Sequence, residues 1–347
     1  MFICENLCPK KYITYERFKM KYLITGATGF IGPHLVRKLV SDGHTCRCLV
    51  RTESNPEPLK TSGVELVEGD ITRAETLQGM ADGIDRVLHM ATLGHMANFR
   101  VTESMFDAIN VQGTQNIMAE ALRAGVQRVV HCSTVAAMGI CEDVPATEES
   151  LCNPHHPYGR SKLKAEQNVL SMIKDKNLPA VIIRFSMVYG PGDSRDILKL
   201  TRMAKKGLFP KVGNRPKLTP LIHVDDAIQG LLQAAENGGI GEIYLITNRD
   251  SLPFDEIRKI LQRALGVKRL PFYVPEWAAL MVASLSEKIF PLLGKIPPVS
   301  RKNIESTLAD RVFSIEKARR EIGFNPQIDP AAGLKETVEW YKEQGWV

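Results

Sequence analysis

The chain has 347 residues, of which 44% are hydrophobic and 24% are charged, values that are ordinary for a globular protein. Its 45 Lys and Arg against 39 Asp and Glu leave a net charge of +6 that is dispersed along the chain, so composition does not indicate a nucleic-acid partner. The most apolar stretch, residues 277–285, is about half as long as a bilayer-crossing helix, and the first 19 residues lack signal-peptide organisation, so we expect no integral membrane span.

The cysteines are odd in number and show no repeated CxxC spacing. This argues against a disulfide framework and against a zinc site, and we expect reduced thiols in a cytoplasmic protein, with no bound metal. The seven positions are Cys4, Cys8, Cys46, Cys48, Cys132, Cys141 and Cys152.

Short apolar runs of β type alternate with helical patterns from residue 20 onward. The expected strands are residues 22–25, 45–50, 64–67, 86–90, 128–132 and 180–184. The expected helices cover about 29–41 and 103–124, and two more begin near residue 73 and at residue 158. Strands that are apolar throughout are typical of a sheet covered on both faces. The fold class is therefore α/β, a Rossmann-type doubly wound parallel sheet.

The alternation loosens after about residue 190, where prolines separate short helices and loops. We expect residues 1–19 to be an N-terminal extension, 20–190 the Rossmann domain, and 191–347 mainly a smaller C-terminal lobe that binds substrate. Two later strands, 221–224 and 243–246, are expected to return to the main sheet, so the segment from about 221 to 248 belongs with it.

The most specific local signal is the glycine turn Gly26-Ala27-Thr28-Gly29-Phe30-Ile31-Gly32, placed directly between a strand and a helix. Gly26 permits the tight turn, Gly29 lets backbone N–H groups approach a pyrophosphate, and Gly32 allows close packing of helix and strand. The helix N-terminus adds unpaired donors and positive partial charge. The turn therefore predicts a bound dinucleotide, with Thr28, Phe30 and Ile31 beside it.

The end of the second strand indicates which dinucleotide is preferred. NAD-specific folds place Asp or Glu there, whereas this chain has Arg51, which can pair with a 2′-phosphate, although Glu53 follows closely. We expect NADP to be favoured over NAD. Asp70 and Ile71 fit a contact to the adenine, and Ala91 and Thr92 follow the fourth strand where the chain must pass the cofactor.

Tyr158 and Lys162 form a YxxxK pair whose spacing puts both side chains on one helix face. A neighbouring ammonium favours the phenolate, so we expect Lys162 to lower the pKa of Tyr158. The fifth strand ends in Ser133 and Thr134, where doubly wound sheets bind ligands. Thr134 is the expected partner of the substrate oxygen while Tyr158 transfers a proton, and Ser133 is the competing hydroxyl.

These motifs, in this order, resemble the extended short-chain dehydrogenase/reductase family over residues 20 to about 345. They are the glycine turn, Asp70, residues 110–114, Ser133-Thr134, the YGRSK of 158–162, Arg184, the VYGPG of 188–192 and the IHVD of 222–225. Alignment through Gly139 assigns the catalytic hydroxyl to Thr134. The resemblance also implies that Val188 contacts the nicotinamide carboxamide through its backbone, and that His223 is structural.

The same resemblance leaves two further implications. Asn110 matches an asparagine that supports a proton relay in some relatives, although a structural role bonding a strand backbone is the alternative. The helix over 103–124 and the helix from Tyr158 commonly form a dimer interface in the family, so a homodimer is expected.

Two reactions compete within the family. One is interconversion of a secondary alcohol and a ketone on a small hydrophobic substrate, as in 3β-hydroxysteroid dehydrogenases and dihydroflavonol 4-reductases. The other is epimerisation or dehydration of a nucleotide sugar. Met187 replaces an asparagine that binds sugar nucleotides, and residues 135–137 replace the acid/base pair needed for water loss, so both features favour the first. A non-catalytic NAD(P)-binding regulator is a third alternative, which intact Thr134, Tyr158 and Lys162 argue against.

The C-terminal stretch 270–298 is unusually apolar and is expected to line a hydrophobic pocket. An ordinary core helix and a peripheral membrane contact are the alternatives. Other residues expected to shape the pocket are Met96, Phe99, Met138 and Met187.

Overall fold

The computed structural model describes residues 19–94, 101–208, 211–213, 217–268, 273–292, 297, 301, 304 and 310–347. Residues 1–18 of the expected extension, the expected pocket residues Met96 and Phe99, and parts of the stretch 270–298 lie outside the described residues. Among the helices that the structure describes, none is both long enough and apolar enough to cross a bilayer.

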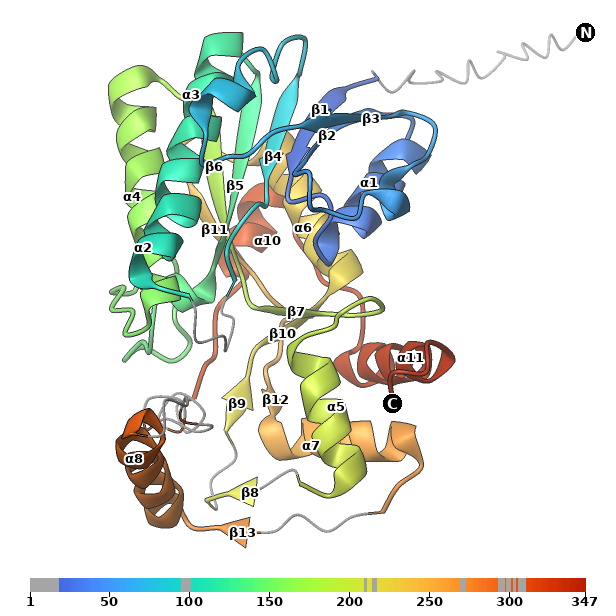
Figure 1. Cartoon of the computed structure of the whole chain (residues 1–347), viewed down its shortest axis with the longest axis vertical. Coiled ribbons are helices and arrows are strands. Elements are labelled where there is room, and N and C mark those ends of the chain that lie inside the picture. Colours follow the sequence, from blue (N-terminus) through green and yellow to red (C-terminus); the bar gives the residue numbers. More distant parts are fainter. Residues whose placement is uncertain are drawn as a thin grey trace, which may run out of the picture.

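A seven-stranded, fully parallel sheet forms the larger lobe and confirms the expected fold class (Figure 1). Its strand order is β11-β6-β5-β4-β1-β2-β3. The strands are β1 (Lys21–Thr25), β2 (Thr45–Val50), β3 (Val64–Glu68), β4 (Arg86–His89), β5 (Arg128–Thr134), β6 (Ala180–Phe185) and β11 (Ile243–Ile246). The chain reverses direction across the sheet between β1 and β4, the point where such sheets bind ligands.

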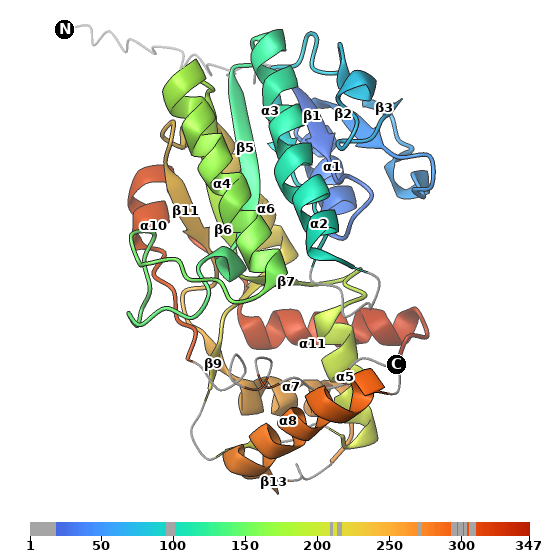
Figure 2. The same ribbon diagram turned by 60° about the vertical axis from the view of Figure 1, so that its left-hand side comes forward.

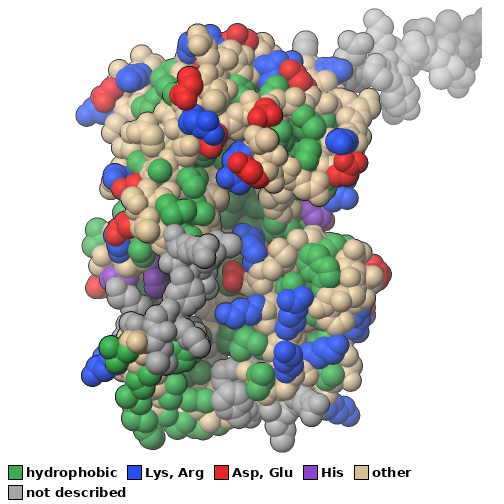
Figure 3. Space-filling view, in the orientation of Figure 1, with side chains coloured by type: hydrophobic (Ala, Val, Ile, Leu, Met, Phe, Trp, Pro, Cys, Tyr) green, Lys and Arg blue, Asp and Glu red, His purple; other side chains and the backbone are tan. Residues whose placement is uncertain are grey.

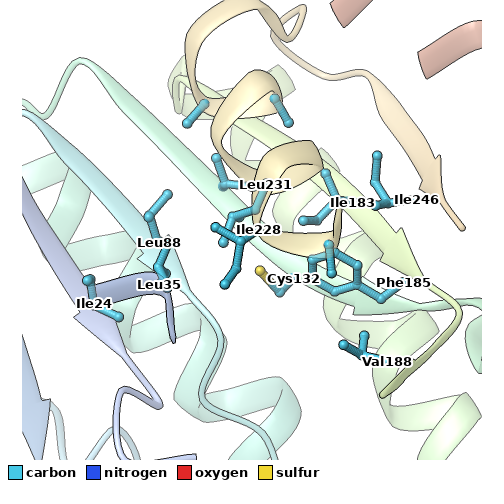
Figure 4. Packing of buried hydrophobic residues seen from close by; sticks show 14 of the residues in the cluster. Ile24, Leu35, Leu88, Cys132, Ile183, Phe185, Val188, Ile228, Leu231 and Ile246 are labelled. Carbon is cyan, nitrogen blue, oxygen red and sulfur yellow. The ribbon is translucent and has the colours of Figure 1, made fainter. Parts of the chain in front are cut away.

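Helices cover both faces of this sheet, which explains why its strands are apolar throughout. One face packs on α3 (Gly113–Ala124) and α4 (Pro157–Lys176), which lie side by side in Figure 2. The other packs on α1 (Ile31–Ser41), α6 (Val224–Asn237) and α10 (Glu316–Ile322). Figure 4 shows this second layer, with Ile24, Leu88 and Ile183 of the strands facing Ile228 and Leu231 of α6.

A smaller lobe lies at the carboxyl ends of the strands (Figure 1). Its helices are α5 (Asp196–Lys206), α7 (Phe254–Leu265), α8 (Glu276–Leu292) and α11 (Pro330–Glu343). Its short strands are β8 (Lys211–Val212), β9 (Leu218–Thr219), β12 (Leu252–Pro253) and β13 (Tyr273–Val274). A separate core holds α5, α7 and α11 together, with Leu198, Leu261 and Val338 among its members.

One expected strand does not join the main sheet. Residues 221–224 give β10 (Leu221–His223), which pairs in parallel with β7 (Met187–Tyr189) as a separate two-stranded sheet. The expectation of a return to the main sheet was wrong for this segment and correct for β11, which pairs with β6. A short apolar run specifies a buried strand but not its partner, because both neighbours are equally apolar.

Two of the expected helices differ from the helices that the structure shows. The segment from residue 73 forms only the 3₁₀ turn η2 (Ala74–Leu77), and Gly79 and Gly83 beyond it adopt positive φ values of 79° and 68°, which end helical geometry. The helix over 103–124 is interrupted: α2 (Glu103–Phe106) is followed by the π-helical segment η3 (Asp107–Gln112) and then α3. The wider turn of η3 holds Asn110, which is fully buried.

Candidate active site

The glycine turn has the geometry that a dinucleotide pyrophosphate requires. Gly26 has a φ of 74°, and a Cβ on it would lie 2.7 Å from the backbone nitrogen of Ala91. A Cβ on Gly32 would lie 1.9 Å from the carbonyl oxygen of Ala27. Helix α1 follows with no side-chain cap at Phe30, which leaves its first N–H groups free for an anion. The residues present therefore fit a dinucleotide, with Thr28, Gly29 and Ile31 lining the same turn.

Arg51 and Asp70 lie near each other where the adenosine end of such a cofactor would reach. Asp70 accepts hydrogen bonds from the backbone N–H and the hydroxyl of Thr72, both at 2.8 Å. Burial alone would raise the pKa of Asp70, but the Thr72 bonds and the charges of Arg73 and Arg51 hold it below its ordinary value. Arg51 and Glu53 are exposed, and Ile71 is buried against Gly113.

A buried histidine fixes the segment that follows β4. The Thr25 hydroxyl lies 2.7 Å from Nδ1 of His89, and Nε2 of His89 lies 3.0 Å from the Thr114 hydroxyl. The Thr25 oxygen also accepts the backbone N–H of Ala91 at 3.1 Å. Burial lowers the pKa of His89 to about 3, so this imidazole is neutral and serves as a bridge. Ala91 and Thr92 are thereby held at the end of the strand.

The two hydroxyls at the end of β5, Ser133 and Thr134, have different partners. Ser133 is buried and donates its hydroxyl to the carboxylate of Glu166. Thr134 is half-buried, and its oxygen accepts the backbone N–H of Ala136 at 3.2 Å. The structure therefore separates the two candidates by their partners, because Ser133 is occupied by a structural carboxylate.

Tyr158 lies at the start of α4, and its phenol hydrogen bonds with the hydroxyls of Thr134 and Thr92. Burial raises the pKa of Tyr158, while the charge of Arg195 and the two threonine bonds act in the opposite direction. The expectation of a lowered pKa was therefore wrong, because desolvation of the phenol outweighs the nearby charges. At neutral pH the phenol keeps its proton.

Lys162 lies one turn further along α4 and is fully buried. Its Nζ donates to the carbonyl oxygen of Cys132 at 2.8 Å, on the strand that also carries Thr134. Burial lowers the pKa of Lys162 to about 8, and the neighbouring His131 is kept neutral because burial lowers its pKa well below 6.5. Lys162 is thus a buried ammonium one helical turn from Tyr158 on α4.

The side chain of Asn110 makes four hydrogen bonds, with the chain after β4 and with α4. Its Oδ1 accepts the Leu93 N–H at 2.8 Å and the Thr92 hydroxyl at 2.9 Å, and its Nδ2 donates to the Leu93 carbonyl at 3.1 Å. Nδ2 also donates to the hydroxyl of Ser161 on α4 at 2.9 Å. Asn110 therefore ties the chain after β4 to α4, and it accepts from the Thr92 hydroxyl that also bonds with Tyr158.

Val188 and His223 lie on the paired strands β7 and β10. Val188 is buried in β7 at the boundary of the two lobes (Figure 4). His223 is buried, and its Nδ1 accepts the Asp225 N–H at 3.3 Å, capping α6. This agrees with the structural role implied for His223.

Arg195 is a site residue that sequence reasoning missed. Its guanidinium carbon lies 5.5 Å from the ring centroid of Phe30 in the glycine turn, and its Nε donates to Asp193 at 3.2 Å. A cavity of about 260 Å³ extends from it along α5. The lining residues are Ser194, Arg195, Leu198, Lys199, Arg202, Met203, Lys206 and Leu208. Four cations in one groove, of which Arg195 is near enough to Tyr158 to act on its pKa, suit an anionic group. The cations at positions 195, 199, 202 and 206 recur at helical spacing, a signal the sequence did carry.

Met138 and Met187, two of the residues expected to shape the pocket, differ in how deeply they are buried. Met138 is fully buried in a small cluster with Val135, Ala146 and Phe313, so it does not line an open pocket. Met187 is half-buried at the start of β7. Helix α8 turns most of its large side chains outward, so the alternative of an ordinary core helix was wrong for it.

Comparison with known proteins identifies the family to which this chain belongs. The model of the NAD dependent epimerase/dehydratase family matches residues 22–247. A 2-alkyl-3-oxoalkanoate reductase of Stenotrophomonas maltophilia is 30% identical over 334 residues, covering 91% of this chain and 98% of that protein. The short-chain dehydrogenase/reductase family 42E member 1 of Bos taurus is 30% identical over 353 residues, covering 94% and 88%.

Among solved structures, the dTDP-glucose 4,6-dehydratase DesIV of Streptomyces venezuelae, with NAD and TYD bound, is similar with a TM-score of 0.78. It is 28% identical, and the match covers 94% of this chain and 98% of that chain. The similarity extends over both lobes.

Proposed function

This chain belongs to the NAD-dependent epimerase/dehydratase family, within the extended short-chain dehydrogenases/reductases, and from that premise we propose that it is an NAD(P)-dependent oxidoreductase acting on a hydrophobic ketone or secondary alcohol. The observation that carries the proposal is the Tyr158 phenol, which keeps its proton and is held by two threonine hydroxyls within one helical turn of a buried ammonium. This arrangement lies at the carboxyl ends of the strands.

The residues divide the work of ketone reduction as follows. A bound nicotinamide cofactor, held by the glycine turn, would supply the hydride. The Thr134 hydroxyl holds the substrate carbonyl oxygen, and the Tyr158 phenol donates its proton to that oxygen as the alcohol forms. Lys162, an ammonium below its pKa of about 8, stabilises the phenolate that is left. In the reverse direction the phenolate takes the proton from the alcohol.

Met187 and residues 135–137 favour this reaction over nucleotide-sugar chemistry. Met187 offers no hydrogen bond to a sugar nucleotide. Val135 and Ala137 are buried apolar residues and cannot supply the acid/base pair that water loss requires. The reductase named above acts on a 2-alkyl-3-oxoalkanoate, which is a ketone with apolar chains and a carboxylate. Such a substrate would place its carboxylate toward Arg195.

Nucleotide-sugar epimerisation is retained as the second candidate because of one observation. The groove of Arg195, Lys199, Arg202 and Lys206 would suit a diphosphate as well as a carboxylate. The groove alone therefore does not separate the two reactions.

The two candidates are separated by supplying NADPH or NADH with panels of 2-alkyl-3-oxo acids, sterol and flavonoid-type ketones, aldehydes and nucleotide sugars. We expect stoichiometric oxidation of the nicotinamide with a hydrophobic ketone. Interconversion of nucleotide sugars without net nicotinamide oxidation would contradict the reductase proposal.

We further propose that NADP is preferred and that Arg51 determines the preference. Changing Arg51 to Glu removes a guanidinium that can pair with a 2′-phosphate and puts a carboxylate there instead. We expect kcat/KM with NADPH to fall about 10- to 100-fold, because a charge-assisted hydrogen bond contributes about 1.5–3 kcal/mol. Efficiency with NADH should be retained or rise.

Lys60→Glu is the matched control, since Lys60 is an exposed cation on the same connection between β2 and β3 and pairs with Glu57 at 2.7 Å. It carries the same change of charge and should leave the ratio of the two efficiencies within about twofold. If wild-type protein uses NAD and NADP equally well, the preference we assign to Arg51 does not exist.

We propose a cytoplasmic location because of the thiols. All five cysteines among the described residues are free, and Cys46, Cys48 and Cys132 are buried.

We propose the surface formed by α3 and α4 as the interface of a homodimer. Light scattering that finds only monomers would contradict the dimer.

A further inference from the structure

Helix α8 is oriented with its large apolar side chains toward solvent. Its buried positions carry small residues: Ala279, Ala283 and Ser286 are at most 7% exposed. Its exposed positions carry large ones, each between 48% and 86% exposed. These are Trp277, Met281, Val282, Leu285, Ile289 and Leu292.

The spacing of the six residues places them on one continuous face. At 3.6 residues per turn they cover an arc of about 140°, and the small residues lie on the opposite side. A helix of a globular protein normally has the reverse pattern, with its large apolar residues facing the core. A contiguous exposed patch of this kind marks a surface that contacts another apolar phase. Figure 3 shows it as the hydrophobic side chains at the lower left, where Figure 1 places α8.

The surroundings of this face are basic. Glu276 and Glu287, the acidic residues of α8, lie away from the exposed arc and are half-buried, whereas Lys288 lies within the arc and is exposed. Lys211 of β8 pairs with Tyr273 of β13, which leads into α8.

Further exposed cations of the smaller lobe lie at the C-terminal end of α5, to the right of α8 in Figure 1. Lys205 and Lys206 are exposed in the last turn of α5, and Leu208 beyond them is also exposed. The cations tied to the apolar face are therefore Lys288 within it and Lys211 on the strand paired with the one that leads into it.

We propose that the α8 face docks on the surface of a phospholipid bilayer that carries anionic headgroups. The large apolar side chains would enter the boundary between headgroups and acyl chains, Trp277 and Tyr273 would lie at headgroup level, and the lysines would face lipid phosphates. A second copy of the chain fits less well, because a protein interface would bury the Lys288 ammonium among large apolar side chains, whereas a bilayer surface leaves it among lipid phosphates. The proposal does not depend on the reaction.

The experiment is co-sedimentation of the full chain with vesicles of phosphatidylcholine alone and of phosphatidylcholine mixed equally with phosphatidylglycerol. We expect binding to the mixed vesicles that weakens as salt is raised. The double variant Met281→Gln, Leu285→Gln should bind about tenfold more weakly or less. Lys211→Gln, Lys288→Gln should lose mainly the preference for the anionic vesicles.

The matched control is Leu151→Gln, Ile240→Gln, which makes the same kind of change at two exposed apolar residues outside α8. It should sediment like the wild type, and circular dichroism should show all variants folded. Absence of wild-type binding to either vesicle, or equal binding by the α8 variant, overturns the proposal. A dimer in light scattering that dissociates only in the α8 variant would assign the face to a second copy and overturn it as well.

Discussion

Changing Tyr158 to Phe is expected to lower kcat about 100- to 10,000-fold, the range by which a positioned general acid accelerates proton transfer. The substitution removes one oxygen and leaves the ring that lies near Phe106, with centroids 6.1 Å apart. The hydroxyls of Thr134 and Thr92 would lose their shared partner, but the glycine turn would be untouched. Turnover is measured with the ketone found active in the panel, and the Kd of the cofactor by fluorescence titration.

Tyr189→Phe is the control for this variant. It removes a buried phenolic oxygen whose bond to the Pro330 carbonyl is long, at 3.4 Å, and it should leave kcat within about threefold. Loss of cofactor binding together with turnover in Tyr158→Phe would mean that the phenol supports the fold rather than the chemistry. A wild type that binds NAD(P) yet turns over none of the panel's substrates would favour the regulator that the sequence left as a third alternative.

The glycine turn and the YxxxK pair could be located from the sequence because their chemistry is local. Gly26 and Gly32 are required by contacts within a strand–turn–helix unit, and four residues on a helix fix the relative placement of Tyr158 and Lys162. The strands were predicted well for the same reason: apolar runs bounded by turns need no knowledge of distant partners.

What the sequence could not supply was the outcome of competition between distant groups. The pKa of Tyr158 depends on how far the phenol is desolvated against the charge of Arg195, and both are set by the packing of the two lobes. Likewise, Ser133 and Thr134 differ only in that Glu166 on α4 reaches the first and not the second.

Helix α8 illustrates a different limit. Its apolar residues are spread around most of the helix, so the periodicity of hydropathy does not indicate which side faces the protein. The clue lay in side-chain size: small residues recur at positions 279, 283 and 286, and large ones occupy the other side. The periodicity of side-chain size therefore distinguishes a helix that packs on the protein through small residues from a helix that packs through large ones. The periodicity of hydropathy does not make this distinction.

Changing Glu166 to Gln is expected to destabilise the fold by about 3–5 kcal/mol, because it leaves a buried charge without its partner. Glu166 and Arg184 are at most 3% exposed, and Nη2 of Arg184 donates to Oε2 of Glu166 at 2.8 Å. Burial would lower the pKa of Arg184, but the bonds to Glu166 raise it above its ordinary value, so the guanidinium stays charged. An arginine inside the apolar run AVIIRF was the sequence signal for such a pair.

The Glu166–Arg184 ion pair also helps to position the candidate active site. Ser133, which precedes Thr134 at the end of β5, donates its hydroxyl to Glu166. Urea unfolding at an unchanged m value measures the loss, and Glu103→Gln is the control, since its bond to Arg160 at 2.8 Å is exposed and contributes about 0–1 kcal/mol. The double variant Glu166→Leu, Arg184→Met should recover much of the stability, because it removes both charges together. If Glu166→Gln costs no more than Glu103→Gln, the buried carboxylate does not hold β5, β6 and α4 together, and the position of Thr134 must then be set by backbone pairing alone.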